Sequence, residues 1–193
     1  LQYNLQHSMG DYLGAIVVME RDTGRVLAMV SNPGYNPNLF EPVNFNSMML
    51  ESVLNDPKLP LYNRATQGVY PLGSVFKIIT MAAALETGVF TPDYPYYCAS
   101  TWTELQGVTL YDWTYDRDLP ASGELTLQEG LMRSCNPWFW HIGYTLWNEG
   151  YTTAIADVAS GFGLGKKTGI EIQEFEGRLE QPTSVSENVQ LAI

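Results

Sequence analysis

The sequence is poor in basic residues and lacks any long apolar run. Ten lysines and arginines stand against 21 acidic residues, giving a formal net charge of −11. Because binding to a phosphate backbone requires a basic face, this balance argues against nucleic acid as a partner. No stretch approaches the roughly 18 to 20 apolar residues of a membrane-spanning helix, and residue 1 does not open a signal peptide.

Cysteine and histidine are also scarce. Cys98 and Cys135 are too few for a disulfide framework, and the sequence alone leaves open whether they pair. His7 and His141 lie far apart without the spacing of metal ligands, so neither a metal site nor a cofactor is predicted. The composition, with 45% hydrophobic and 16% charged residues, is typical of a globular protein.

The apolar pattern predicts a mixed α/β (α+β) fold. Residues 13–31 hold two β-type runs around a glycine turn, which indicates an antiparallel hairpin. Residues 78–86 are apolar and alanine-rich and stop at Gly88, as a helix does. Three further helices are expected at about 126–133, 138–148 and 151–160. Because helices and strands do not alternate regularly, we expect an antiparallel sheet packed with helices.

Two long stretches read as irregular. Residues 32–63 carry repeated Asn-Pro and Asp-Pro turn signals around one short helix at 48–54. Residues 89–123 are rich in tyrosine, tryptophan and proline and offer only a short strand at 108–110. A second short strand, or an extended segment, is expected at 169–172.

The first candidate for chemistry is the stretch Tyr70-Pro-Leu-Gly-Ser-Val-Phe-Lys77. It places Ser74 at the expected start of the helix, where serine is a favoured N-cap, and Lys77 one turn later on the same face. A lysine among apolar neighbours in a first helical turn has its charged form disfavoured by burial and by the helix dipole. The pair therefore fits a serine nucleophile with a lysine base, as well as an N-cap with a solvated lysine.

The second candidate is Ser134-Cys-Asn136, at the break before Pro137. A serine and an asparagine two residues apart on a turn project to the same side. They offer a hydroxyl that can relay a proton and an amide that can bind a substrate amide. Alone, this stretch also fits a helix end followed by proline.

Taken together and in order, these motifs resemble the class B penicillin-binding proteins, within the superfamily that includes the serine β-lactamases. The hairpin at 14–33, Tyr35-Asn-Pro-Asn38, Asn63-Arg-Ala-Thr66 and the stretch 161–172 continue the likeness, which covers nearly the whole chain. One departure is Leu72, where the family usually has proline.

The resemblance implies a D,D-transpeptidase that crosslinks peptidoglycan stem peptides. By this resemblance Ser74 would be the nucleophile and Lys77 its base. Ser134 would be the proton relay and Asn136 a substrate-binding residue. β-Lactams would acylate Ser74. It further implies a place on the extracytoplasmic face of a bacterial membrane, in a membrane-anchored protein that works with other cell-wall synthesis proteins.

The family has a third motif, K-T-G, and this chain contains Lys167-Thr-Gly169. The family places that motif on a strand farther downstream, so we interpret this copy as a structural stretch. Residues 1–193 are then expected to be a partial transpeptidase domain, cut at both ends, with the true third-motif strand beyond residue 193.

Two other functions fit the same superfamily. A β-lactamase needs a base that activates water. The class A enzymes use a glutamate between the second and third motifs, which has no counterpart here, and the class D enzymes usually carry S-x-V where this chain has Ser134-Cys-Asn136. A β-lactam-sensing domain without catalysis is the other alternative.

Overall fold

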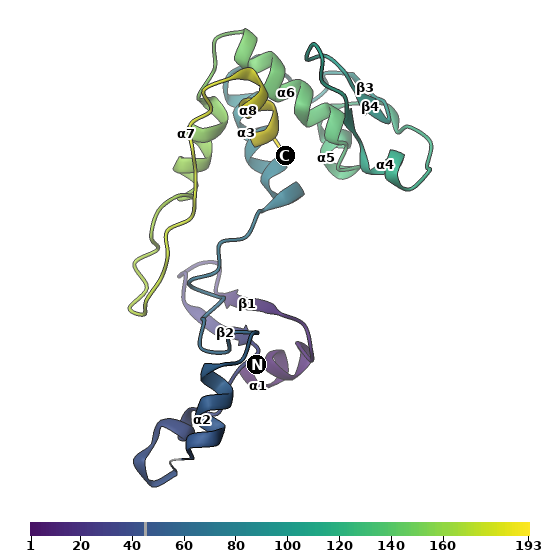
Figure 1. Cartoon of the computed structure of the whole chain (residues 1–193). Coiled ribbons are helices and arrows are strands. Elements are labelled where there is room, and N and C mark those ends of the chain that lie inside the picture. The colour runs from purple at the N-terminus through teal and green to yellow at the C-terminus, as the bar shows by residue number, and fades with distance from the viewer. Residues whose placement is uncertain (45) are drawn as a thin grey trace. The chain divides into compact units, whose positions relative to one another are not determined.

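The computed structural model describes residues 1–44 and 46–193 of the chain. The chain forms two compact units (Figure 1). The N-terminal unit comprises Leu1–Val69 and Lys167–Glu176, and the helical unit comprises Tyr70–Lys166 and Gly177–Ile193.

The N-terminal unit is built on the predicted hairpin. Strands β1 (Gly14–Met19) and β2 (Val26–Asn32) pair antiparallel, with Gly14 opposite Asn32. Gly24 supplies the positive φ of 72° that the connecting turn requires. The expected antiparallel hairpin is thus confirmed.

A helix absent from the sequence-based expectations, α1 (Gln2–Ser8), contacts β2. The Gln2 side chain donates to the carbonyl of Met29 at 2.7 Å and accepts from its N–H at 2.9 Å. Such a paired amide contact imitates the pattern of a further strand, so it satisfies backbone groups on the open edge of β2.

The rest of the N-terminal unit is mostly loop. It contains the 3₁₀ turns η1 (Pro37–Phe40) and η2 (Pro42–Asn44) and the helix α2 (Ser47–Leu54). Helix α2 confirms the short helix expected at 48–54. Of the two alternatives for residues 169–172, the strand is wrong: the backbone N–H groups of Thr168 and Gly169 bind a glutamate side chain instead of a neighbouring strand.

Besides the one-turn helix α4 (Trp113–Asp116), the helical unit contains five helices (Figure 1). They are α3 (Lys77–Glu86), α5 (Leu127–Met132), α6 (Asn136–Asn148), α7 (Ala154–Gly161) and α8 (Val185–Leu191). Helix α3 contacts α5, α6 and α7, and α8 packs on α6. Four of the five were expected from the apolar pattern, and α8 was not. Within the described residues, no helix is long and apolar enough to cross a membrane.

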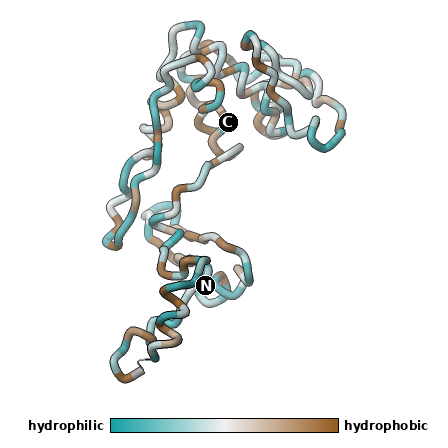
Figure 2. The backbone as a smooth tube through the Cα atoms, viewed as in Figure 1, coloured by the Kyte–Doolittle hydropathy of each residue, from teal (hydrophilic) through white to brown (hydrophobic). Residues whose placement is uncertain are grey.

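The core of this unit lies where α3, α6 and α7 meet. Apolar residues are brown along the trace in Figure 2, and the fully buried ones include Ala83, Ala84, Phe139, Ile142, Leu146, Ile155 and Ala159. Burying a large apolar side chain contributes about 1.5 to 3 kcal/mol, so this cluster fixes the position of α3 against α6.

The stretch 89–123 is more ordered than its sequence suggests. Strand β3 (Tyr96–Cys98) pairs with β6 (Gly123–Leu125), and β4 (Thr101–Trp102) pairs with β5 (Leu110–Tyr111). A one-turn helix, α4 (Trp113–Asp116), follows β5. The strands have two or three residues each, too few for an alternating pattern to be recognised.

These small sheets pack against α6. The hydroxyl of Tyr96 donates to Glu104 at 2.7 Å, and the other oxygen of Glu104 lies 2.7 Å from Nδ1 of His141 on α6. The observed architecture, small antiparallel sheets packed with helices, confirms the predicted mixed α/β class.

Candidate active site

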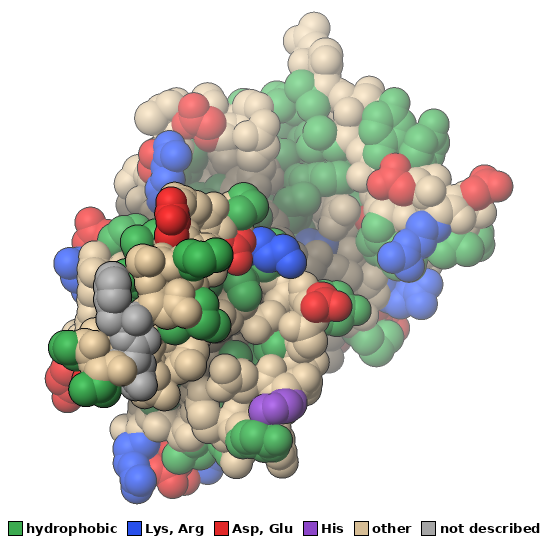
Figure 3. Space-filling view, turned by 60° about the horizontal axis from the view of Figure 1, so that its bottom comes forward, with side chains coloured by type: hydrophobic (Ala, Val, Ile, Leu, Met, Phe, Trp, Pro, Cys, Tyr) green, Lys and Arg blue, Asp and Glu red, His purple; other side chains and the backbone are tan. Residues whose placement is uncertain are grey.

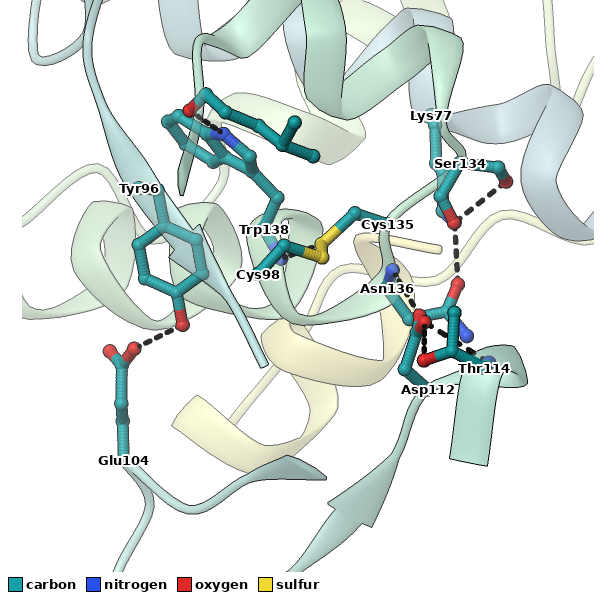
Figure 4. Close-up of a disulfide and its surroundings, with 11 residues drawn as sticks. Lys77, Tyr96, Cys98, Glu104, Asp112, Thr114, Ser134, Cys135, Asn136 and Trp138 are labelled. Atoms are coloured by element: carbon teal, nitrogen blue, oxygen red, sulfur yellow. Dashed lines mark hydrogen bonds between the residues drawn. A yellow bond between two sulfur atoms is a disulfide. The ribbon is translucent and has the colours of Figure 1, made fainter. Parts of the chain in front are cut away.

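Lys77 is the first residue of α3 and is fully buried. Its Nζ lies 2.8 Å from the carbonyl oxygen of Ser134, 3.1 Å from the Ser134 Oγ and 2.5 Å from the Oδ1 of Asn136. Figure 4 shows these three side chains together. The structure therefore joins the lysine of S-x-x-K to both polar residues of S-x-N, across nearly 60 residues of sequence.

The break between α5 and α6 presents Ser134 and Asn136 to the lysine. Ser134 has a φ of 53°, a left-handed conformation that is uncommon for a residue with a side chain. Cys135 then acts as the N-cap of α6, and its Sγ accepts from the N–H of Trp138 at 3.3 Å. Pro137 occupies the first turn, where its missing N–H costs nothing. A strained residue held in this way is a frequent feature of functional sites.

Ser74 lies on the 3₁₀ turn η3 (Gly73–Phe76), directly before α3, and its side chain is exposed. The expectation that Ser74 is the helix N-cap is wrong, because the turn begins one residue earlier, at Gly73 with its positive φ of 55°. Within the described part of the chain, no hydrogen bond joins Lys77 to Ser74: the three bonds of its Nζ go to Ser134 and Asn136.

Burial lowers the pKa of Lys77 from 10.5 to about 8, and the negative charge of Asp112 opposes the shift. Desolvation disfavours the ammonium form, as expected for a lysine inside an apolar core. The Nζ also lies 5.3 Å from the ring centroid of Phe139, whose face favours the charged form. A lysine with this pKa is a usable base near neutral pH.

The hydrogen-bond partners define what a neutral Lys77 can do. The carbonyl of Ser134 and the Oδ1 of Asn136 only accept, so they take both N–H groups of a neutral amine. The lone pair is then left facing the Ser134 hydroxyl, which donates to it; in the ammonium form the direction reverses. Lys77 and Ser134 can thus exchange a proton without moving.

Asp112 belongs to the site as well, although no sequence motif pointed to it. This fully buried residue follows β5, and its Oδ1 accepts the backbone N–H of Asn136 at 2.9 Å (Figure 4). Its Oδ2 accepts from the backbone N–H and the hydroxyl of Thr114, at 3.2 and 2.7 Å. An aspartate N-cap before Trp113 can be recognised in the sequence, but its contact with a motif 24 residues away cannot.

The two cysteines, whose pairing the sequence left open, form a disulfide between Cys98 of β3 and Cys135 (Figure 4). Both are fully buried. Since Cys135 is the middle residue of S-x-N, the bond ties the Ser134–Asn136 turn covalently to the small sheet.

The third-motif look-alike lies in the N-terminal unit. The carboxylate of Glu174 accepts from the backbone N–H groups of Thr168 and Gly169 at 3.0 and 2.8 Å, and from the Thr168 hydroxyl at 2.7 Å. These bonds, the Thr168 hydroxyl first, lower the pKa of Glu174. The backbone N–H groups of Thr168 and Gly169 and the Thr168 hydroxyl, which could bind a ligand, are therefore used inside their own loop.

Acidic and basic side chains are interspersed on the face of the molecule in Figure 3, and they form no continuous basic surface there. Among the described residues, no group of three or more histidine, cysteine, aspartate or glutamate side chains is placed to hold a metal ion.

A serine on a turn before a helix, a buried lysine one turn later and a facing S-x-N define the class of penicillin-recognising serine proteins. The family model of the penicillin-binding protein transpeptidase domain matches residues 14–193, and the chain belongs to this family. The resemblance seen in the sequence is thereby confirmed.

Individual relatives agree. The chain is 33% identical over 183 residues to the peptidoglycan D,D-transpeptidase MrdA of Salmonella typhimurium, covering 93% of this chain and 28% of the length of that relative. It also resembles a solved structure of a peptidoglycan synthase complex, with 32% identity and a TM-score of 0.80 over 100% of this chain and 33% of the other. The penicillin G acyl-enzyme complex of penicillin-binding protein A from Mycobacterium tuberculosis matches 100% of this chain and 44% of its own, with 29% identity and a TM-score of 0.82.

Proposed function

We propose that this chain is part of a peptidoglycan D,D-transpeptidase that forms an acyl-enzyme on Ser74. The observation that carries the proposal is the contact of buried Lys77 with both Ser134 and Asn136, beside an exposed serine one turn earlier. The relative in Salmonella is a peptidoglycan D,D-transpeptidase, and the relative in M. tuberculosis forms an acyl-enzyme with penicillin G.

In the proposed reaction the Ser74 Oγ attacks the carbonyl carbon of the penultimate D-alanine of a stem peptide. Lys77, as the neutral amine, turns its lone pair from the Ser134 hydroxyl to the Ser74 hydroxyl and accepts the Ser74 proton. Ser134 passes a proton from Lys77 to the nitrogen of the departing D-alanine as the carbon–nitrogen bond breaks. The Nδ2 group of Asn136 binds an amide carbonyl of the donor peptide. An amine of a second stem peptide then attacks the acyl-enzyme carbonyl and gives up a proton, which returns to the Ser74 Oγ as the ester bond breaks; this step forms the crosslink and frees Ser74.

β-Lactams are proposed to acylate the same serine. The resulting ester is proposed to persist, because the chain has no segment like the one that carries the class A glutamate and has Asn136 where the class D lactamases usually have valine. We further propose that the third-motif strand lies beyond residue 193, which is supported by the engagement of Thr168 and Gly169 with Glu174.

The proposed location is the extracytoplasmic face of a bacterial membrane, in a membrane-anchored protein. Its disulfide fits an oxidising compartment. Because a related structure is a peptidoglycan synthase complex, proteins of cell-wall synthesis are the proposed partners, with peptidoglycan stem peptides as substrates.

Fluorescent penicillin tests the proposal in the full-length protein. We expect stable covalent labelling of the wild type and no labelling of Ser74→Ala, while Ser52→Ala, a matched change of an exposed serine on α2, labels normally. Rapid turnover of the penicillin would indicate a β-lactamase instead. Stable labelling without crosslinking of stem peptides would indicate a sensing domain, and absence of labelling in the wild type would contradict the proposal.

A further inference from the structure

Asp112 is unusual in being a fully buried acid. It and Lys77 are the two fully buried charged side chains among the residues that the structure describes. Burying a carboxylate is costly unless hydrogen-bond donors surround it, and Asp112 accepts from three: the N–H of Asn136 and the N–H and hydroxyl of Thr114. Its own backbone N–H donates to the carbonyl of Ser100 at 2.9 Å, which holds it at the end of β5.

Asn136 is consequently held at two places. Lys77 donates to its side-chain oxygen, and Asp112 accepts its backbone N–H. Asn136 is the first residue of α6, where backbone N–H groups have no partner inside the helix. Asp112 satisfies one of these groups from a segment 24 residues earlier in the chain.

We infer that Asp112 is a positioning residue for acyl transfer: by holding the N–H of Asn136, it fixes the turn that aims Ser134 and Asn136 at Lys77. This inference rests on the proposed function and deepens it. Asp112 acts through Asn136, and it need not touch the substrate. Loss of its carboxylate leaves the N–H of Asn136 without its acceptor and lets the left-handed turn at Ser134 relax away from the lysine.

Besides positioning Asn136, the charge of Asp112 acts on the pKa of Lys77. This second effect works against the reaction, because it favours the protonated form of the base. It stabilises the ammonium form and so raises the pKa of Lys77 against the lowering by burial. Other titratable groups lie on or directly after the elements that contact α3, namely Glu129, Arg133, His141, Tyr144, Glu149 and Asp157. Asp112 is the one whose charge shifts the pKa of Lys77. Its removal therefore makes Lys77 a neutral amine at lower pH.

These two effects can be separated by substitution. Asp112→Ala removes both the charge and the acceptor for Asn136. Asp112→Asn removes the charge and keeps one oxygen for the N–H of Asn136. Thr114→Val removes one donor to Asp112 and keeps both the charge and the acceptor. Asp157→Asn is the control, because Asp157 also accepts from a threonine hydroxyl, that of Thr153, on the exposed side of α7.

The measurement is the acylation rate of the full-length protein by fluorescent penicillin between about pH 6 and about pH 10. We expect Asp112→Ala to lower the plateau rate about 10- to 100-fold, as small misplacements of catalytic groups do. Asp112→Asn should recover part of that loss. The acid limb of the profile is the pH range in which the rate rises as Lys77 loses its proton. In both variants this limb should move to lower pH, whereas in Thr114→Val and Asp157→Asn it should stay at the wild-type pH.

A folded Asp112→Ala protein with the wild-type plateau overturns the inference, as does Asp112→Asn with an unmoved acid limb. A purely structural defect would lower the rate and the melting temperature without moving the limb. If Asp112→Ala does not fold, the profile of Asp112→Asn decides. Failure of the proposed function is distinguishable, because the wild type itself would then show no Ser74-dependent labelling.

Discussion

The Nζ of Lys77 lies 2.5 Å from the Oδ1 of Asn136. Since an ammonium or amine N–H donates to an amide oxygen, this contact fixes which end of the Asn136 amide faces the lysine. The two N–H donors of the amide are left for another acceptor, such as a carbonyl of the peptide donor. The base and the substrate-binding residue of the proposed site are thus oriented by each other.

Substitution of Asn136 by aspartate should change the pKa of Lys77, because it puts a negative charge in place of the neutral amide that contacts the lysine. Asn136→Asp places a carboxylate against Lys77, which favours the ammonium form and raises its pKa above about 8. We expect slower acylation by penicillin at neutral pH and an acid limb that moves to higher pH. Asn148→Asp, at the other end of α6, is the control. An unchanged limb in Asn136→Asp would mean that Lys77 is not the group that titrates in the reaction.

The burial of Lys77 should also be visible in the stability of the fold. Its pKa is about 8 in the folded protein, against 10.5 for a solvated lysine, so the unfolded chain binds the proton more readily. The resulting cost, about 3 kcal/mol at neutral pH, falls as pH rises between these two values. The stability of the wild type should therefore gain about 2 kcal/mol relative to Lys77→Met between about pH 7 and about pH 9.5.

Urea unfolding of the two proteins at both pH values measures this difference. Comparing the two proteins cancels the tyrosines, including Tyr96, whose pKa is raised by burial and by its bond to Glu104. A constant difference between wild type and Lys77→Met across this range would contradict the lowered pKa.

Loss of the disulfide should slow acylation as well as lower the stability of the fold. The variant Cys98→Ala/Cys135→Ser removes the crosslink and keeps an oxygen at the N-cap of α6. A crosslink that closes a loop of this length contributes about 2 to 4 kcal/mol. Because Cys135 lies between Ser134 and Asn136, we also expect acylation to slow by roughly 10-fold.

Thermal unfolding and penicillin labelling of the same samples test both parts. Reduction of the wild type by a dithiol should reproduce the slower acylation, and reoxidation should restore it. A lower melting temperature with an unchanged acylation rate would limit the disulfide to a role in the fold.

The sequence predicts the long apolar helices well and the site only in part. Residues 78–86 and 138–148 repeat a helical pattern over several turns, and α3 and α6 occupy these ranges. The strands in residues 89–123 are too short for any period, so their order comes from packing against α6.

The same limit applies to the side chains of the site. Ser74, Lys77, Ser134 and Asn136 carry motifs that can be read locally. The role of Asp112 depends on a contact with Asn136 across 24 residues, and no local pattern encodes it. Serine is a good N-cap, so the sequence alone places the start of the helix at Ser74, whereas in the structure Gly73 begins a 3₁₀ turn ahead of Ser74.

Lys167-Thr-Gly169, which resembles the third motif, should not take part in the reaction. Lys167 is exposed, and the neighbouring Thr168 and Gly169 donate to Glu174. Lys167→Ala should therefore label with penicillin within about twofold of the wild-type rate, as surface substitutions usually do. Lys77→Ala, the matched loss of a buried lysine, should slow labelling about 1000-fold, because a general base is lost. A comparable loss in both variants would show that Lys167 belongs to the reacting site and that its motif is the functional one.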